Sequence, residues 1–235
     1  MKTVVISLGG SILLPELNKN RIREYIPVLK SIAAKHRLFV VVGGGGGARD
    51  YIGAARALGI DEGTSDEIGI LVTRLNATLL IAALGDAAYP KVAESHAEAK
   101  KYAEGRKIVV MGGITPGQTT DAVAAVLAER VGADVFFNVT SVPGVYDKDP
   151  KKYKTARHFP ALTPAELLEI VGKIGLSAGS HAPLDIIAAR IVERSHIPLV
   201  VLDGTTPENL SSAILDGKFN GTIVREKSKK KLLPL

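Results

Sequence analysis

The chain has 235 residues, a formal net charge of +6 and no cysteine, so disulfides and thiolate metal sites are excluded. With 46% hydrophobic and 23% charged residues, it has the composition of a globular protein with a sizeable core. No apolar run approaches the roughly 20 residues that a membrane-spanning helix needs. The N-terminus shows no signal-peptide pattern. We therefore expect a cytoplasmic protein without a membrane partner.

Part of the positive charge lies in a lysine-rich tail at residues 227–231. No aromatic residue is interleaved with these lysines, and only 5% of the chain is aromatic, so stacking platforms for bases are scarce. We expect a solvated tail and no nucleic-acid partner. A basic balance also suits small anionic substrates.

The N-terminal half repeats one plan, in which a short apolar strand ends in a polar or glycine-rich loop and a helix follows. The predicted strands lie at residues 3–8, 38–42, 107–111 and 134–138. The predicted helices lie at residues 18–36, with a kink at Pro27, and at 49–58, 64–84 and 121–131. We expect Gly59 to end the second helix, and Thr64 or Ser65 to cap the third, with Asp66 in its first turn. Residues 87–105 are ambiguous, with a short strand near Tyr89 before a charged helix or loop. The repetition favours a right-handed parallel α/β sheet.

The C-terminal half changes pattern after residue 140. Turn signals surround Val145-Tyr146, which we assign to a small hairpin. Thr163 and Glu166 form a capping-box pattern at a helix start. The remaining predicted elements are a flexible Gly/Ser loop at 172–180, helices at 183–195 and 207–215, a strand at 197–202 and a final edge strand at 221–224.

Three glycine loops follow three of the predicted strands: Gly9-Gly10, Gly43 to Gly47, and Gly112-Gly113. At the carboxyl ends of one parallel sheet they would converge on one crevice, where open α/β sheets bind ligands. Glycine amides and helix N-termini suit phosphates, and phosphoryl transfer needs mainly positioning and charge neutralisation. The Walker pattern is absent, and the histidines have no metal-ligand spacing. The pattern predicts a phosphate-handling enzyme.

Four motifs carry a family resemblance. They are Gly9-Gly10-Ser11, Gly43-Gly44-Gly45 with Arg49, Thr119-Thr120-Asp121, and Gly144-Val145-Tyr146 with Asp149-Pro150. Together they resemble the amino acid kinase superfamily and, within it, the uridylate (UMP) kinases of the archaeal type, over essentially the whole chain.

This resemblance implies one amino acid kinase domain over residues 1–235, an α/β fold with a three-layer αβα sandwich and a mainly parallel central sheet. It also implies a UMP-binding acceptor lobe at about residues 1–130 and an ATP lobe at about 131–235. The implied reaction is reversible transfer of the ATP γ-phosphate to UMP in pyrimidine nucleotide biosynthesis. Mg²⁺ with ATP and a homohexameric assembly come with the family.

The resemblance also assigns roles to individual residues. Asp121, Arg49, Gly9 and Gly10 are expected to carry catalysis, with Asp121 organising the groups around the transferring phosphoryl group. The expected UMP-binding residues are Gly44, Asp66, Ile114, Thr115, Pro116, Gly117, Gln118, Thr119 and Thr120. The expected ATP-binding residues are Gly9, Gly10, Ser11, Gly45, Arg49, Thr140, Tyr146 and Asp149. No protein residue is expected to act as a metal ligand.

Three positions depart from the family pattern. Ser7 and Ser141 stand where many members carry lysines, and Pro143 replaces an aspartate. Because electrostatic stabilisation is commonly the largest catalytic contribution, other groups must replace these lysines. We expect Mg²⁺, loop amides and Arg49 to do so, with Lys218 as a further candidate. Two alternatives stay open: an isopentenyl phosphate kinase-like enzyme, and a nucleotide sensor that has lost catalysis.

Overall fold

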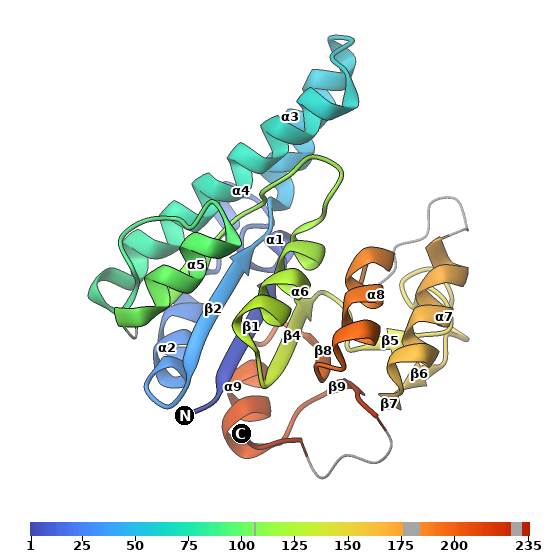
Figure 1. Ribbon diagram of the computed structural model, residues 1–235. Helices are drawn as coiled ribbons and strands as arrows, with labels where there is room; N and C mark the ends of the chain where they lie inside the picture. Colours follow the sequence, from blue (N-terminus) through green and yellow to red (C-terminus); the bar gives the residue numbers. More distant parts are fainter. Residues whose placement is uncertain (106, 176–183, 227–231) are drawn as a thin grey trace.

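The computed structural model describes residues 1–105, 107–175, 184–226 and 232–235 (Figure 1). Within them, seven strands form one sheet in the order β3-β2-β1-β4-β8-β9-β7. These strands are β1 (Thr3–Leu8), β2 (Arg37–Val42), β3 (Val109–Met111), β4 (Val135–Thr140), β7 (Ala161–Leu162), β8 (Leu199–Asp203) and β9 (Gly221–Val224). A separate antiparallel pair joins β5 (Val145–Tyr146) to β6 (His158–Phe159) and confirms the predicted hairpin.

The central strands are parallel, and their register brings the functional loops to one edge. Ser7 of β1 lies opposite Val41 of β2 on one side and Asn138 of β4 on the other. The strands are almost wholly buried and consist mainly of Val, Ile, Leu and Phe, as expected for parallel strands covered on both faces. All of them end at the same edge, so the segments after Leu8, Val42 and Thr140 meet there.

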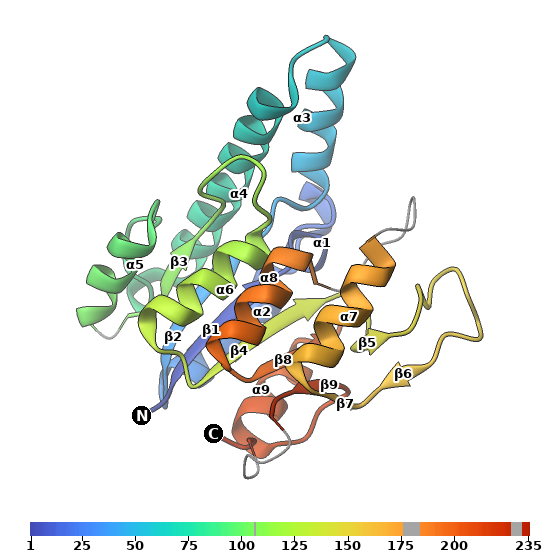
Figure 2. The same cartoon turned by 45° about the vertical axis from the view of Figure 1, so that its right-hand side comes forward.

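Helices cover both faces of the sheet, which confirms the three-layer α/β sandwich (Figure 2). One apolar cluster joins a face of the sheet to α1 (Gly10–Leu13), α2 (Ile22–Ala33), α4 (Glu62–Leu84) and α9 (Pro207–Asp216). The other joins the opposite face to α5 (His96–Tyr102), α6 (Thr120–Val131), α7 (Pro164–Gly175) and α8 (Ile186–Ser195). Val4 and Ile6 face the first cluster while Val5 faces the second, which is the alternation of a strand buried on both sides.

Helix α3 (Gly45–Ala57) packs against α4, and the two project as a hairpin beyond the rest of the molecule (Figures 1 and 2). By length and composition α4 could cross a membrane, with a mean hydropathy of 1.8 and 39% of its apolar window buried. However, its buried face carries the polar residues Ser65, Thr73 and Asn76. Four apolar residues of its C-terminal half pack into the core against the sheet: Ala77, Leu80, Ile81 and Leu84. These contacts identify α4 as a structural helix of the sandwich.

Several helix starts differ from the sequence predictions. Helix α3 begins at Gly45, not at Arg49, so three glycines form its first turn. Helix α4 begins at Glu62 and is capped by Asp61, whose side chain accepts from the Thr64 amide at 2.9 Å. The predicted caps Thr64 and Ser65 are therefore wrong, and Asp66 lies beyond the first turn. An aspartate one turn earlier offers a stronger acceptor than either hydroxyl.

Other predictions are confirmed or corrected in the same way. Pro27 lies inside α2 and does not end it. Gly59 follows α3 with a φ of 76°, as predicted for a C-terminal glycine. Thr163 and Glu166 exchange the two hydrogen bonds of a capping box, which confirms the predicted start of α7. The ambiguous stretch contains α5, with Ala88 bridged to Ile108 beside β3.

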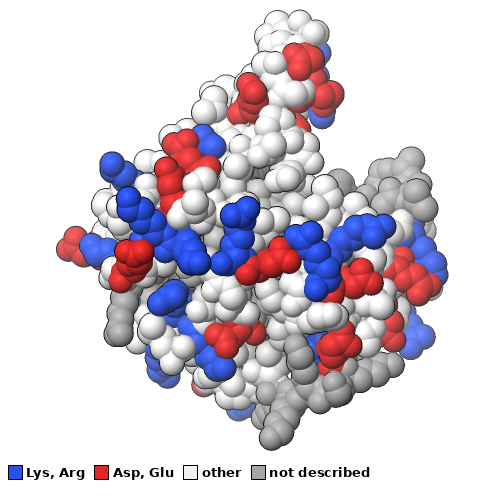
Figure 3. All heavy atoms as spheres, viewed as in Figure 1, with Lys and Arg blue, Asp and Glu red and all other residues white. Residues whose placement is uncertain are grey.

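Residues 221–224 were predicted to form an edge strand. This position in the sheet is wrong, because β9 pairs with β8 on one side and with β7 on the other. The edge strand is β7, which was too short to stand out in the sequence. Residues 172–175 of the predicted flexible loop belong to α7, while 176–180 lie outside the described residues, as does the lysine tail at 227–231. The division into lobes near residue 130 stays a prediction. Figure 3 shows Lys and Arg interspersed with Asp and Glu on the face it presents, rather than gathered in one basic patch.

Candidate active site

Two of the glycine loops touch each other directly at the carboxyl edge of the sheet. A Cβ on Gly10 would overlap the Gly45 amide nitrogen and the Gly43 carbonyl group, and a Cβ on Gly45 would overlap the carbonyl oxygens of Leu14 and Gly10. Gly45 also has a φ of 64°. Backbone packing this close is possible only without side chains. The glycines therefore hold α1 and the start of α3 against each other.

Helix α4 fixes the second glycine loop from the side. The buried amide of Asn76 donates to the carbonyl oxygens of Gly43 at 3.0 Å and Gly44 at 3.1 Å. The Gly9 amide donates to Val139 at the end of β4, also at 3.0 Å. Because both loops are held by hydrogen bonds to buried elements, the site is largely preformed on its β1–β2 side.

Asp121 is the carboxylate at the centre of this edge. It is the second residue of α6, whose N-cap is Thr119. Ser7 Oγ donates to Asp121 Oδ1 at 2.6 Å, and Asn138 Nδ2 lies 3.5 Å from Oδ2. Ser7, in place of the expected lysine, thus positions this carboxylate.

Burial, with a smaller contribution from the nearby charge of Asp185, raises the pKa of Asp121 to about 6, even though the hydrogen bonds from Ser7 and Asn138 act in the opposite direction. A carboxylate with a raised pKa in a ligand-binding crevice is a candidate functional group.

Asp185 is a site residue that the sequence analysis missed. Its Oδ1 caps α8 by accepting from the amides of Ile187 at 2.7 Å and Ala188 at 2.9 Å. Its Oδ2 accepts from the Thr119 hydroxyl, which itself caps α6. One carboxylate therefore couples the starts of two helices beside Asp121. No motif surrounds Asp185; its position before a helical pattern was the available signal.

A cavity of about 240 Å³ opens between α3, α4 and the loop before α6. Its walls include six of the nine residues expected to bind UMP: Gly44, Asp66, Thr115, Gln118, Thr119 and Thr120. Ile114, Pro116 and Gly117 do not line it. The other lining residues, which the sequence analysis did not assign, are Ala48, Ile52, Gly69, Ile70, Thr73 and Gly113. The structure thus gathers residues from three separate segments into one acceptor-sized hollow.

Among the described residues, three hydrogen bonds attach the 112–119 loop to α4, one of them from Arg74 Nε to the Gly113 carbonyl oxygen at 3.2 Å. Asp66 Oδ2 accepts from the Gly117 amide at 2.7 Å. Thr73 Oγ1 accepts from the Gly113 amide at 2.6 Å. A Cβ on Gly112 would clash with Thr73 and the Arg74 amide nitrogen, which explains why this loop also begins with glycines. Gly117 lies outside the cavity wall but holds Asp66, so its expected role becomes one of positioning.

Arg49 lies on α3, one turn after the glycines. A Cβ placed on Gly46 would be 3.8 Å from Arg49 Nη2, so the guanidinium group folds back along the first turn of its own helix. The residue is exposed. This orientation brings a bidentate cation beside the phosphate-binding loop that the sequence predicts. In the described chain, no hydrogen bond or ion pair joins the side chain of the other proposed cation, Lys218, to a site residue.

The residues expected to bind ATP have structural partners. Thr140 ends β4, and its carbonyl accepts from Gly204 at 2.9 Å. The Tyr146 ring lies 5.0 Å from that of His158 across the hairpin. Asp149 is buried, with Oδ1 accepting from the Lys151 amide at 2.9 Å. Ser11 is exposed on α1. None of these residues lines the cavity described above.

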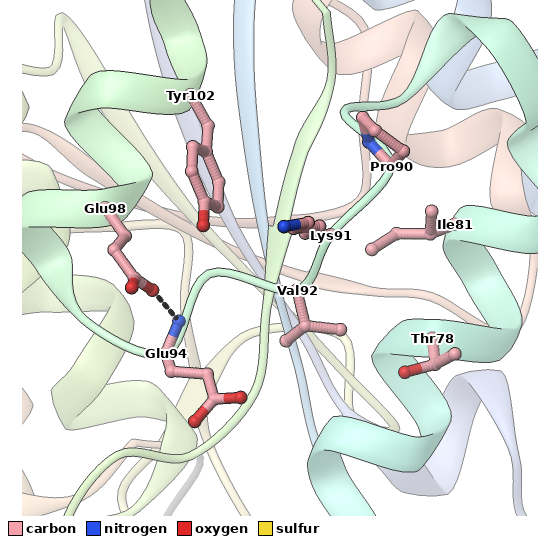
Figure 4. A pocket seen from close by; sticks show the side chains of 8 residues that line it. All are labelled: Thr78, Ile81, Pro90, Lys91, Val92, Glu94, Glu98 and Tyr102. Carbon is pink, nitrogen blue, oxygen red and sulfur yellow. Dashed lines mark hydrogen bonds between the residues drawn. The ribbon is translucent and has the colours of Figure 1, made fainter.

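A second cavity, of about 390 Å³, lies between α4, the 90–94 segment and α5 (Figure 4). Lys91, Glu94, Glu98 and Tyr102 project around it, and Glu98 accepts from the Glu94 amide. Arg74 connects the two cavities, because it binds Glu94 at 2.7 Å and the Gly113 carbonyl at 3.2 Å. No residue expected to bind substrate lines this second cavity.

Across the described ranges, no group of three or more His, Cys, Asp or Glu side chains is arranged to hold a metal ion. Asp121 can still serve a Mg²⁺ ion that arrives with a nucleotide, because Mg²⁺ takes one or two carboxylates together with phosphate and water oxygens.

Comparison with known proteins places this geometry in a family. The model of the amino acid kinase family matches residues 2–203. A uridylate kinase of Methanoregula boonei is 76% identical over 235 residues, which are 100% of this chain and 100% of that protein. A uridylate kinase of Methanoculleus marisnigri is 59% identical over 226 residues, which are 96% of this chain and 97% of that protein.

Solved structures agree. The crystal structure of a uridylate kinase from Archaeoglobus fulgidus superposes with a TM-score of 0.84 at 47% identity, covering 95% of this chain and 100% of that one. A UMP kinase from Bacillus anthracis, at 21% identity and a TM-score of 0.79, shares the fold.

Proposed function

Because this chain belongs to the amino acid kinase family, we propose that it is a UMP kinase that transfers the γ-phosphate of ATP to UMP and releases UDP and ADP, reversibly. The observation that supports this most strongly is the acceptor cavity beside Asp121. Six residues expected to bind UMP line it, and they come from α3, α4 and the loop before α6. The high identity to archaeal proteins named uridylate kinase supports the choice of acceptor.

In this proposal UMP lies in the cavity, with its phosphate directed toward the glycine loops. Asp66 suits the ribose hydroxyls, since a carboxylate can accept from both. In this proposal the amides at the start of α3 and the Thr120 hydroxyl donate to the acceptor phosphate, whereas the Thr119 hydroxyl already donates to Asp185. ATP approaches from the β4 side, past Thr140 and the β5–β6 hairpin, so that the two phosphate groups meet at Gly9, Gly10 and Asp121.

In the chemical step an oxygen of the UMP phosphate attacks the γ-phosphorus, and the bond to the bridging oxygen of ADP breaks. The protein holds the two groups in line and neutralises charge on the transferring group. Mg²⁺ bound to ATP supplies part of this neutralisation when present. Asp121, held by Ser7 and Asn138, orients the groups around the transferred phosphoryl, and Arg49 adds a guanidinium from α3.

We further propose that the enzyme is cytoplasmic, acts in pyrimidine nucleotide biosynthesis and assembles from several copies, as a homohexamer. Support for assembly comes from α4, where Leu71, Leu75 and Leu79 recur every four residues and are 62%, 66% and 46% exposed. An apolar stripe of this kind on a projecting helix suits a subunit contact.

The test is ADP formation from ATP and Mg²⁺ with UMP, CMP, dUMP and isopentenyl phosphate offered in parallel. The proposal predicts strong preference for UMP. Turnover with isopentenyl phosphate alone would instead assign the neighbouring kinase activity. Binding of UMP and ATP without turnover would identify a nucleotide sensor.

A further inference from the structure

We propose that Lys151 is a binding residue for the phosphate chain of the donor nucleotide, and that Ser141 positions its ammonium group. The proposal rests on a nucleoside triphosphate being the phosphoryl donor. No motif in the sequence singled out Lys151, which lies in a run of basic residues between the hairpin strands.

The first observation is a tether between two turns. Lys151 Nζ donates to Ser141 Oγ at 2.8 Å, although ten positions separate them in the chain. The backbone of the same residue is also held, because its amide donates to the buried Asp149 at 2.9 Å. A lysine held at both its backbone and its tip loses less conformational freedom when it binds a ligand than a free surface lysine does.

The second observation is where the tether places the charge. Ser141 follows Thr140, the last residue of β4, and Asn138 of the same strand lies beside Asp121. Three residues of extended chain span about 10 Å. The ammonium group therefore lies at the carboxyl edge of the sheet, a short way from Asp121 on the donor side, next to the strand end that binds the Gly9 amide. A polyphosphate chain can extend across this interval.

The third observation is that this charge is not neutralised. The ion pairs among the described residues do not include Lys151. By contrast, Arg74 is paired with Glu94, and Arg21 with Glu24. A neutral hydroxyl directs the Lys151 ammonium without cancelling its charge, so it remains available to an anion. Two further donors are left on the ammonium group for phosphate oxygens.

This arrangement supplies a second positive charge, at the end of β4, in addition to that of Arg49 on α3. Arg49 extends from α3 on the acceptor side, whereas Lys151 is held at the end of β4. The two cations would approach the transferring phosphoryl group from opposite sides, which replaces the expected contribution of Lys218.

The experiment measures binding of a non-hydrolysable ATP analogue and of adenosine by calorimetry, to the wild type and to Lys151→Met. Loss of a charge-assisted phosphate contact is expected to lower the affinity for the analogue by about tenfold or more. Adenosine lacks phosphates, and its affinity should be unchanged. Lys151→Arg should restore most of the affinity, and Ser141→Ala, which removes only the tether, should cause a smaller loss.

Lys154→Met is the matched control, because it removes the same charge from an exposed position in the same segment. Its affinity for the ATP analogue should equal that of the wild type. In steady state, Lys151→Met should lower kcat/KM for ATP and leave the KM for UMP unchanged. Equal affinity of Lys151→Met and wild type for the analogue would overturn the proposal, as would an equal loss for adenosine. Because binding is read without the acceptor, failure of the UMP kinase assignment would be seen separately, as absent UDP formation.

Discussion

The acceptor side and the donor side of the site are built differently. On the acceptor side, backbone contacts between glycines and hydrogen bonds from Asn76, Thr73 and Asp66 hold three segments around one cavity. On the donor side, Tyr146 lies in a two-strand hairpin and Asp149 in its connecting turn, and neither residue lines the acceptor cavity.

This difference indicates that the acceptor site is preorganised, whereas the donor site depends on turn residues whose polar groups already have partners. A preorganised site loses little binding free energy, because its residues are already ordered before the ligand binds. Substitutions on the acceptor side should therefore disturb stability and catalysis together, and those on the donor side should mainly change nucleotide affinity.

The largest effect is expected at Gly10. Gly10→Ala would drive a Cβ into the Gly43 and Gly45 backbone, which cannot move without displacing α3. We expect a loss of about 3 kcal/mol or more in unfolding free energy and loss of activity. Gly53→Ala is the control, since a Cβ there meets nothing within 4 Å in the same helix α3; it should gain about 0.5–1 kcal/mol. Urea unfolding measures both, and a Gly10→Ala protein as stable as wild type would contradict the close loop contact.

Asp121→Asn preserves shape and removes the charge at the centre of the site. We expect kcat to fall by about 100-fold or more, with the KM for UMP little changed, because the group acts on the transferring phosphoryl and not on the nucleoside. Steady-state kinetics with varied UMP test this. A kcat within threefold of wild type would remove Asp121 from the catalytic centre.

The same variant gives a pH prediction. The pKa of Asp121 is about 6 in the folded chain, whereas that of an ordinary aspartate is 3.8. Below pH 4 the buried carboxyl group is neutral, so its burial does not destabilise the wild type. As pH rises through 6 the group ionises, and the wild type loses free energy of unfolding. Asp121→Asn does not ionise. Its stability relative to wild type should therefore increase by about 2.5 kcal/mol between pH 4 and pH 7.5. Denaturant titrations of both proteins at the two pH values measure this, and a constant difference would contradict the raised pKa.

Arg49→Ala should lower kcat by about 10- to 100-fold, because one charge-assisted contact to phosphate is lost. Arg56, on the same helix but paired with Glu62 far from the loops, is the control position. Unchanged turnover of Arg49→Ala would show that this arginine is a surface residue.

Asp66→Ala separates the two sides by kinetics alone. It removes a candidate ribose ligand and the anchor of the Gly117 amide, so the KM for UMP should rise by about tenfold while the KM for ATP stays constant. The adjacent exposed Glu67→Ala should change neither constant. Equal increases in both KM values would argue against a distinct acceptor pocket.

The smallest effect is expected at the second cavity. Glu94→Gln weakens the ion pair that holds Arg74 against Gly113. We expect the KM for UMP to rise by about two- to threefold, since the pair is partly exposed. Lys91 lies in the same cavity wall, and among the described residues no hydrogen bond or ion pair joins it to Arg74. Lys91→Met should therefore leave the KM for UMP unchanged. If both variants behave as wild type, the cavities are not coupled.

The parallel sheet could be predicted because it depends on local signals, namely apolar runs that end in glycines such as Gly10 and Gly45. The three-layer sandwich followed from the family resemblance. The UMP-binding roles of Asp66 and Thr120 come from the same resemblance and stay predictions. Helix starts were less accurate, because several hydroxyl and carboxyl groups competed for each cap. At α4 the cap is Asp61 and not the predicted Thr64 or Ser65, and α6 begins at Thr120, one residue before the predicted start.

Residues whose roles depend on long-range contacts could not be predicted. Asp185 meets Thr119 across 66 positions, and Lys151 looks like one of several lysines until its turn folds onto Ser141. The order of β7 and β9 was missed because a two-residue strand carries almost no periodicity.

The most direct test of the central claim follows the phosphoryl group itself. With γ-labelled ATP and Mg²⁺, the account predicts that the label appears in UDP. The rate of labelling should fall sharply in Asp121→Asn at any UMP concentration. In Asp66→Ala it should fall only when the UMP concentration is low. Label that stays in ATP when UMP is saturating, or that enters isopentenyl phosphate and not UMP, would contradict it.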